Sequence, residues 1–387
     1  MEKRGTMPDL QYMRETYETL HRHPELSGQE VWTADFVAKE LAGLGFALRT
    51  NLGGTGLMGT LEFAHPGQTL ALRCDMDALP IQEETGVSYA SQNQGVMHAC
   101  GHDSHMATLL GVCRYAARHK DRFTGTLMVI FQHAEEIVLG AKAMLEAGLF
   151  SQHLPGRLVA IHNWPSLPAG TLGLQQGPIT AYADRFTATF HGQGGHGAFP
   201  WKSKDPIAMA TTGIQDAFSL AQRRSDTSFP QTLSFGMIHG GTRFNVIPQE
   251  VVVEGTVRTC REEDQARMID NLHQAFAAGA SLHGGEYVLE YQKGVPAVIN
   301  DSTVVDELGS AFAAKIPETP VIQEGLASLI GEDVAYYLQE VPGALLLVGS
   351  GQEGFISELH HPGFLVPNKT LETGYKALTS IMEMYLS

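Results

Sequence analysis

The chain of 387 residues is long enough for two domains, and its apolar, aromatic and charged fractions are those of a globular protein. A formal net charge of -16 with no basic run argues against nucleic acid as a partner. No apolar run approaches the roughly 18 residues that a membrane span needs, and residues 1–8 lack an apolar signal region. The 4 cysteines form no CxxC pair, which argues against a disulfide framework. We therefore expect a cytoplasmic protein.

Hydrophobic periodicity predicts helices and strands over the first 177 residues. Helices are expected at 8–22, 30–44 and 139–147, with another that follows residue 105. Strands are expected at 56–63, 69–75, 125–132 and 157–161. The strand at 69–75 is a nearly continuous apolar run, which is typical of a strand buried on both faces of a sheet.

The segment 98–105, with the sequence HACGHDSH, concentrates possible ligands of a transition metal. One thiolate and three imidazoles are available, from Cys100, His98, His102 and His105. Gly101 permits a tight turn, and Asp103 could orient a neighbouring imidazole. The alternative is a histidine-rich surface turn around a structural cysteine. The density of ligands favours a metal site.

The strand at 69–75 leads into two acids, Asp75 and Asp77. Polar groups at the carboxyl ends of strands in an open α/β sheet tend to line the site. The two acids could therefore face metals or support their ligands. A solvated acidic turn before Pro80 explains them equally well, so neither is predicted to be a metal ligand.

Two adjacent glutamates, Glu135 and Glu136, follow the apolar strand at 125–132. A buried charge is costly unless it is paired or binds a metal. Because neighbours on an irregular turn can point in different directions, one can bind metal while the other serves as a general base. The alternative is a helix N-terminus whose acids complement the helix dipole.

His162 directly follows the apolar strand at 157–161. Taken alone, His162 is better explained as a core histidine with satisfied hydrogen bonds. It is, however, the third strand end in a row to present a candidate ligand. This repetition favours a metal role more strongly than any single motif does.

The pattern of elements changes between residues 177 and 294. Four strands are expected at 184–191, 232–239, 250–259 and 286–292, with two helices at 205–222 and 262–283. The order β-α-β-β-α-β is that of a ferredoxin-like split unit. We therefore predict an α/β catalytic domain in two parts, 1–177 and 294–387, interrupted by an inserted α+β domain at 178–293.

The second part of the catalytic domain continues the helix and strand pattern. Helices are expected at 302–314, 332–340 and from 368 to the end, with a strand at 344–348. His360 lies in a glycine-rich loop between that strand and the last helix.

The inserted domain carries polar residues of its own. His196 lies in the glycine-rich loop 192–200, Asn245 follows a glycine pair, and Arg258 lies in a strand. A side-chain amide and a guanidinium could together hold a substrate carboxylate. Taken alone, Asn245 is explained more simply as a turn residue and Arg258 as an edge-strand charge.

The chain resembles the bimetallic amidohydrolases typified by hippurate hydrolase and indole-3-acetyl-amino-acid hydrolase, within the aminoacylase/carboxypeptidase superfamily of zinc metallopeptidases. The resemblance spans almost the whole chain. It rests on segments beginning at Leu20, Arg73, His98, Phe131, Gly194, Asn245 and Leu359, and together these are highly specific.

The resemblance implies a fold and a set of roles. The fold would be a zinc-peptidase-like catalytic domain, with a mixed central sheet flanked by helices, and a ferredoxin-like lid through which the protein forms a homodimer. Two divalent metals, zinc or manganese with cobalt or nickel as alternatives, would bind to Cys100, His102, Glu136, His162 and His360. Glu135 would be the general base. His196, reaching the site of a partner subunit, would steady the oxyanion, and Asn245 and Arg258 would bind the substrate carboxylate.

The expected activity is that of a metal-dependent amidohydrolase that cleaves N-acyl amino acids to a carboxylate and a free amino acid. One alternative is a dipeptidase or aminopeptidase with the same metals; another is a non-catalytic metal-binding protein. Two departures from the family pattern are visible. His133 stands where proline is usual, which leaves its role and the substrate details open. Val334 replaces a usual phenylalanine, a change expected to affect packing only.

Overall fold

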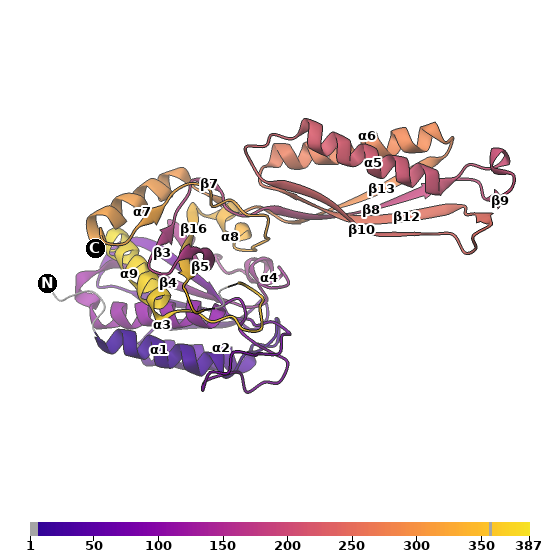
Figure 1. Cartoon of the computed structure of the whole chain (residues 1–387). Helices are drawn as coiled ribbons and strands as arrows, with labels where there is room; N and C mark the ends of the chain where they lie inside the picture. The colour runs from indigo at the N-terminus through magenta and orange to yellow at the C-terminus, as the bar shows by residue number, and fades with distance from the viewer. Residues whose placement is uncertain (1–6, 356–357) are drawn as a thin grey trace. The chain divides into compact units, whose positions relative to one another are not determined.

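The computed structural model describes residues 7–355 and 358–387 and divides into two compact units (Figure 1). Unit 1 contains the described residues of Met1–Gly177, Val298–Leu326 and Asp333–Ser387, and unit 2 contains Pro178–Ala297 and Ala327–Glu332. The start of the chain, for which the sequence indicates no apolar signal region, lies outside the described residues up to position 6. Within the described ranges, no helix combines the length and apolarity needed to cross a bilayer.

Unit 1 is built on an 8-stranded mixed sheet. In spatial order its strands are β1 (Ala47–Leu52), β2 (Gly56–Glu62), β4 (Thr124–Gln132), β3 (His65–Asp75), β5 (Arg157–Pro168), β16 (Gly343–Gly351), β6 (Leu172–Gly173) and β15 (Val321–Ile322). β4, β3, β5 and β16 are parallel neighbours, whereas β1 and β2 pair antiparallel. The parallel strands therefore bring their carboxyl ends to the same end of the sheet, where sites form in α/β folds.

The helices of unit 1 cover this sheet. They are α1 (Met7–His21), α2 (Val31–Gly43), α3 (His102–Arg118), α4 (Gly140–Glu146), α7 (Ser302–Lys315), α8 (Ala335–Glu340) and α9 (Asn368–Tyr385). Apolar residues such as Leu41 of α2, Leu110 of α3 and Leu308 of α7 share one core with Leu72 of the sheet. Because α3 is buried along most of its length, its first residue, His102, is held in a fixed position.

Unit 2 is a four-stranded antiparallel sheet with two helices side by side (Figure 1). Its strands and helices are, in chain order, β8 (Tyr182–His191), α5 (Pro206–Arg224), β10 (Gln231–Gly240), β12 (Glu250–Thr259), α6 (Glu262–Leu282) and β13 (Glu286–Val295). Phe190 of β8, Met209 of α5, Val253 of β12 and Phe276 of α6 form its core. The sheet order β10-β12-β8-β13 is that of a ferredoxin-like unit.

Shorter elements lie between these. They are β7 (Gly177–Pro178), β9 (Gly195–His196), β11 (Val246–Ile247), β14 (Ile299–Asn300) and the single 3-10 turns η1 (Lys120–Arg122) and η2 (Pro200–Lys202).

The mixed α/β fold with an inserted ferredoxin-like unit agrees with the prediction, but several local features differ. The sequence did not indicate β1, which is a half-exposed edge strand without an apolar run. β5 does not end before His162; it continues to Pro168, because pairing with β16 extends the strand. The helix expected at 332–340 begins only at Ala335, since Asp333 is used in buried hydrogen bonds.

Candidate metal centre

The carboxyl ends of neighbouring parallel strands place the polar residues of the site. Asp75 is the last residue of β3, and the turn after β4 carries Glu135 and Glu136. His162 lies in β5, in register with Leu347 of β16. These side chains therefore meet because β4, β3 and β5 are adjacent in the sheet.

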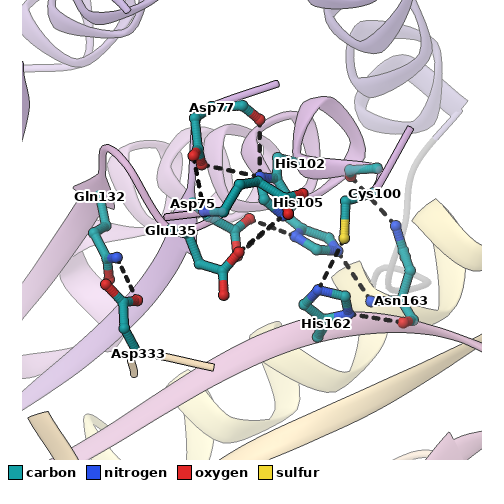
Figure 2. Close-up of polar contacts among 12 residues, drawn as sticks. Asp75, Asp77, Cys100, His102, His105, Gln132, Glu135, His162, Asn163 and Asp333 are labelled. Carbon is teal, nitrogen blue, oxygen red and sulfur yellow. Dashed lines mark hydrogen bonds and ion pairs between the residues drawn. The ribbon is translucent and has the colours of Figure 1, made fainter. Parts of the chain in front are cut away.

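The donor atoms of several residues converge on one region. Those of Cys100, His102 and His162 lie within 4.8 Å of one another, and so do those of Cys100, Glu136 and His360. Figure 2 shows the Cys100 sulfur and the His102 and His162 rings gathered beside Glu135. The structure thus brings together all five residues predicted as ligands, from a span of 261 positions between 100 and 360.

His102 is oriented by one acid and directed towards two others. Its Nδ1 contacts the backbone carbonyl oxygen of Asp77 at 2.9 Å. Its Nε2 is buried without a hydrogen-bond partner among the described residues. That nitrogen lies 3.9 Å from a Glu135 oxygen and 3.8 Å from a Glu136 oxygen. Because Nδ1 faces the carbonyl, Nε2 is the nitrogen that can bind a metal when the ring is neutral.

His162 and Cys100 face each other across the cluster. His162 Nδ1 contacts the backbone carbonyl oxygen of Asn163 at 2.8 Å, and Nε2 lies 3.5 Å from the sulfur of Cys100. Cys100 precedes Gly101, whose φ of 86° lies in the left-handed region that glycine adopts readily. The turn between Cys100 and α3 therefore depends on Gly101, as the sequence indicates.

Glu136 connects the sheet to the C-terminal loop. Its carboxylate Oε2 lies 3.4 Å from Nε2 of His360, while its backbone N–H donates to Asp77 Oδ2 at 2.9 Å. His360 has a φ of 62°, which is strained for a residue with a Cβ. The backbone N–H of His360 donates to the carbonyl oxygen of Ala99 at 2.8 Å. This bond holds the loop of His360 against the segment that carries Cys100.

The electrostatics of the cluster fit a bound cation. Burial raises the pKa of Glu136 to about 7. Burial, reinforced by the charges of Glu136 and Glu135, holds the pKa of the Cys100 thiol well above its usual value. A divalent cation would reverse both effects, since it stabilises the thiolate and the carboxylate. A thiolate, the Nε2 atoms of three imidazoles and a carboxylate form a donor set suited to zinc and similar metals.

Two histidines of the 98–105 segment have different surroundings. His105 Nδ1 contacts Asp75 at 2.6 Å, and its Nε2 accepts the backbone N–H of Asn163 at 3.0 Å. Both nitrogens of His105 are thus engaged within the protein. His98 is buried, and neither of its ring nitrogens has a hydrogen-bond partner in the part of the chain that the structure describes. Burial lowers the pKa of His98 to about 4, so it is neutral.

Comparisons of the sequence and the structure with known proteins identify relatives of this chain. Residues 71–384 match the family model "Peptidase family M20/M25/M40". The chain belongs to this family. It is 35% identical to N-acetyl-L-cysteine deacetylase of Bacillus subtilis, over 90% of this chain and 82% of that protein. It is 39% identical to N-acyl-L-amino acid amidohydrolase of Geobacillus stearothermophilus, over 73% of this chain and 76% of that protein.

A solved structure supports the same assignment. The Bacillus subtilis YXEP protein, a dinuclear metal-binding peptidase from the M20 family, matches with a TM-score of 0.86 and 30% identity, over 98% of this chain and 99% of that one. Membership of the family makes this chain a metal-binding amidohydrolase, an enzyme that hydrolyses amide bonds.

The sequence did not indicate Asn163, and it suggested Asp103 as well as Asp77 as a support for the imidazoles. Asn163 donates its side-chain N–H to the Ser104 hydroxyl at 2.8 Å, which ties β5 to the start of α3. Asp77, and not Asp103, hydrogen-bonds His102, whereas Asp103 contacts His21 at 2.6 Å. The contact between Asp103 and His21 could not be predicted, because it depends on where α1 packs and the local sequence does not show that.

His133, which stands where the family usually has proline, packs against the β1–β2 turn. Its Nε2 contacts the carbonyl oxygen of Gly53 at 3.1 Å. A Cβ at Gly54 would lie 2.6 Å from the His133 ring, and one at Gly56 would lie 2.8 Å from it. His133 is therefore a buried packing residue of this turn, and among the described residues none of its hydrogen bonds reaches the donor cluster.

The candidate residues of unit 2 fall into two places. β9 pairs with β11 so that His196 lies opposite Val246, and the backbone N–H of Gly197 donates to the Asn245 carbonyl at 2.8 Å. His196 and Asn245 therefore neighbour each other on exposed loops. Arg258 lies near the far end of β12, with roughly 25 Å of strand between it and these loops. Within one unit 2, Asn245 and Arg258 cannot hold the same carboxylate.

The buried His21 predicts a pH dependence of stability. Burial disfavours its imidazolium, but hydrogen bonds to Asp103 and Glu83 outweigh this and raise the pKa to about 9. In the unfolded chain its pKa is about 6.5. The stabilisation is therefore complete below about pH 6.5 and is lost as the pH rises to about 9, with a total on the order of 3 kcal/mol.

Urea unfolding between pH 6 and pH 9.5 measures this loss. The His21→Gln variant, which cannot ionise, serves as the control and should show a flatter curve over the same interval. Parallel curves for the two proteins would contradict the assigned role of His21.

Proposed function

We propose that this chain hydrolyses N-acyl amino acids to a carboxylate and a free amino acid. The observation that carries the proposal is the convergence of Cys100, His102, Glu136, His162 and His360 beside Glu135. Relatives that are 35% and 39% identical are named for deacetylation of N-acetylcysteine and for hydrolysis of N-acyl-L-amino acids. The donor chemistry and the likeness to a dinuclear peptidase support two divalent metals, zinc or manganese, held by those five residues.

The proposed chemistry uses Glu135 to carry one proton from the attacking water to the leaving nitrogen. Divalent cations, when bound, supply Lewis acidity that polarises the amide carbonyl and lowers the pKa of water. A carboxylate oxygen of Glu135 accepts the proton of the attacking water as the new carbon–oxygen bond forms. Glu135 then donates that proton to the leaving nitrogen as the carbon–nitrogen bond breaks. Glu135 returns to its ionised state, and the products are a carboxylic acid and an amine. The acid then passes its remaining proton to the amine, which leaves a carboxylate and an ammonium group.

Surrounding contacts prepare Glu135 and its neighbours for these steps. Glu135 is only 6% exposed, so few waters compete for its carboxylate. Asp77 holds both the ring of His102 and the backbone of Glu136, which fixes their relative positions. Positioning of this kind lowers the barrier because little reorganisation remains at the moment of reaction.

The roles of the unit 2 residues belong to the same proposal. His196 stabilises the oxyanion, and Asn245 and Arg258 bind the free carboxylate of the substrate. Since Asn245 and Arg258 of one unit 2 are separated along β12, we propose that the two come from different copies in a homodimer. A cytoplasmic location is likewise part of the proposal.

A substrate panel with metal removal tests this function. Enzyme treated with a chelator should lose at least roughly 100-fold in activity, and added Zn²⁺ or Mn²⁺ should restore it. The restored enzyme should release free amino acid from N-acetyl, benzoyl or indoleacetyl amino acids. Dipeptides with a free N-terminus are the comparison. Cleavage of those dipeptides alone would indicate the dipeptidase alternative, and metal-loaded protein without any activity would indicate a binding protein.

A further inference from the structure

A buried carboxylate outside the donor cluster is hydrogen-bonded to the turn that carries the proposed general base. Glu30, the residue before α2, is 0% exposed. Burying a carboxylate is costly unless hydrogen bonds or charges compensate it. The compensation at Glu30 comes from its own loop and from two segments that are distant in sequence.

The three contacts of Glu30 are short. Oε1 accepts the backbone N–H of Ala134 at 2.9 Å and that of Gly28 at 2.9 Å. Oε2 accepts the hydroxyl of Thr55 at 2.6 Å. Glu30 thus joins the loop before α2, the β1–β2 turn and the residue immediately before Glu135.

The turn that Glu30 holds is strained. Ala134 has a φ of 51° and Val138 a φ of 52°, both in the left-handed region. This region is unfavourable for a residue with a Cβ, so the conformation persists only where surrounding contacts impose it. On one side His133 contacts Gly53, and on the other the Glu136 N–H donates to Asp77. The bond from Ala134 to Glu30 lies between these two.

We propose that Glu30 is a positioning residue for the general base Glu135. By accepting the N–H of Ala134, Glu30 fixes the peptide between His133 and Ala134, one residue before Glu135, and so restrains the direction of the Glu135 side chain. The Glu135 carboxylate then stays 3.9 Å from His102 Nε2, beside the donor cluster. The inference rests on the proposed function, because the role of Glu135 belongs to it. A displacement of about 1 Å at such a group can cost roughly 100-fold in rate.

The alternative is that Glu30 only stabilises the fold. A structural role would lower the midpoint of unfolding but leave kcat unchanged at temperatures where the enzyme is folded. A positioning role lowers kcat under those conditions and leaves KM and metal content unchanged, because Glu30 touches neither substrate nor ligand.

Three variants of the metal-loaded enzyme separate these roles. Glu30→Ala removes all three contacts, and kcat should fall roughly 100-fold with KM within about twofold. Glu30→Gln keeps an oxygen for the two N–H groups, and its amide can donate to Thr55. Its kcat should therefore stay within about threefold of wild type. Thr55→Val removes only the contact to Oε2 and should give a smaller loss than Glu30→Ala.

Hydrogen exchange supplies a readout that does not depend on activity. The amide of Ala134, followed in a peptide covering 131–140, should exchange faster in Glu30→Ala and at the wild-type rate in Glu30→Gln. If Glu30→Ala does not fold, Glu30→Asp replaces it, since its shorter side chain cannot reach Ala134 and Gly28 together.

The outcomes distinguish this inference from the proposed function. Faster exchange at residue 134 with an unchanged kcat would overturn the positioning role while leaving the function intact. An equal loss of kcat in Glu30→Ala and Glu30→Gln would also overturn it. A wild-type enzyme that cleaves no acyl amino acid defeats the proposed function, and exchange at residue 134 would still report whether Glu30 holds the turn.

Discussion

Replacing Glu135 by glutamine should reduce the hydrolysis of N-acyl amino acids about 1,000-fold. Glutamine keeps the size and one oxygen of the side chain but cannot accept a proton from water. The deficit should lie in kcat, since Glu135 is proposed to act on the proton and not to bind the substrate. Steady-state kinetics on the best substrate of the panel, at saturating Zn²⁺ or Mn²⁺, measures the loss.

Metal content and stability provide the controls for this variant. Glu135→Gln should bind the same amount of metal as wild type, because Glu135 is not among the five proposed ligands. The matched variant Glu136→Gln alters a proposed ligand on the next residue and should lose metal as well as activity. Retention of more than a tenth of the wild-type kcat in Glu135→Gln would remove Glu135 from the mechanism.

Replacing Arg73 by methionine should destabilise the protein by about 3–5 kcal/mol. The Arg73 guanidinium is fully buried and lies 2.9 Å from Asp75 and 3.3 Å from Asp333. Its Nε also donates to Gln132 at 2.9 Å. Without Arg73, the two buried carboxylates lose a countercharge, and the strand ends that carry the site lose their connection to the segment before α8.

The pKa of Asp75 shows the strength of this environment. Burial opposes its ionisation, but the charges of His102, His105 and Arg73 hold its pKa well below the usual value. Removing Arg73 therefore also weakens the support that Asp75 gives to His105.

Urea unfolding of two companion variants tests the explanation for Arg73→Met. The partly exposed pair of Arg157 and Glu307 offers the matched control, and Arg157→Met should cost no more than about 1 kcal/mol. Adding Asp333→Asn to Arg73→Met should recover part of the loss, because it removes one uncompensated charge. If Arg73→Met costs no more than Arg157→Met, the buried network does not stabilise the fold as described.

The order of elements and the region of the site follow from local sequence. The apolar runs of β3, β4 and β5, each followed by polar residues, predict adjacent buried strands with a site at their carboxyl ends. The spacing of Cys100 and His102 around Gly101 points to a metal without any tertiary information. These features are readable because the same short segment holds both the structural signal and the chemistry.

Other features depend on contacts between distant segments. His102 and His105 have the same chemistry and lie three residues apart. They differ because Asp75 and Asn163 hydrogen-bond both nitrogens of His105, whereas Nε2 of His102 has no such partner among the described residues. Likewise, Asp333 meets Gln132, at a separation of 201 positions, with a 2.6 Å hydrogen bond that no local pattern indicates.

The sequence by itself thus determined the α/β class and the inserted ferredoxin-like unit, and it predicted the residues that the fold brings together. Only the tertiary structure decided which imidazoles keep a free nitrogen, and that Glu30 is bonded to the turn before Glu135. The physical reason is that donor chemistry is a property of each side chain. Whether a donor is free depends on hydrogen bonds to neighbours that the fold brings from elsewhere in the chain.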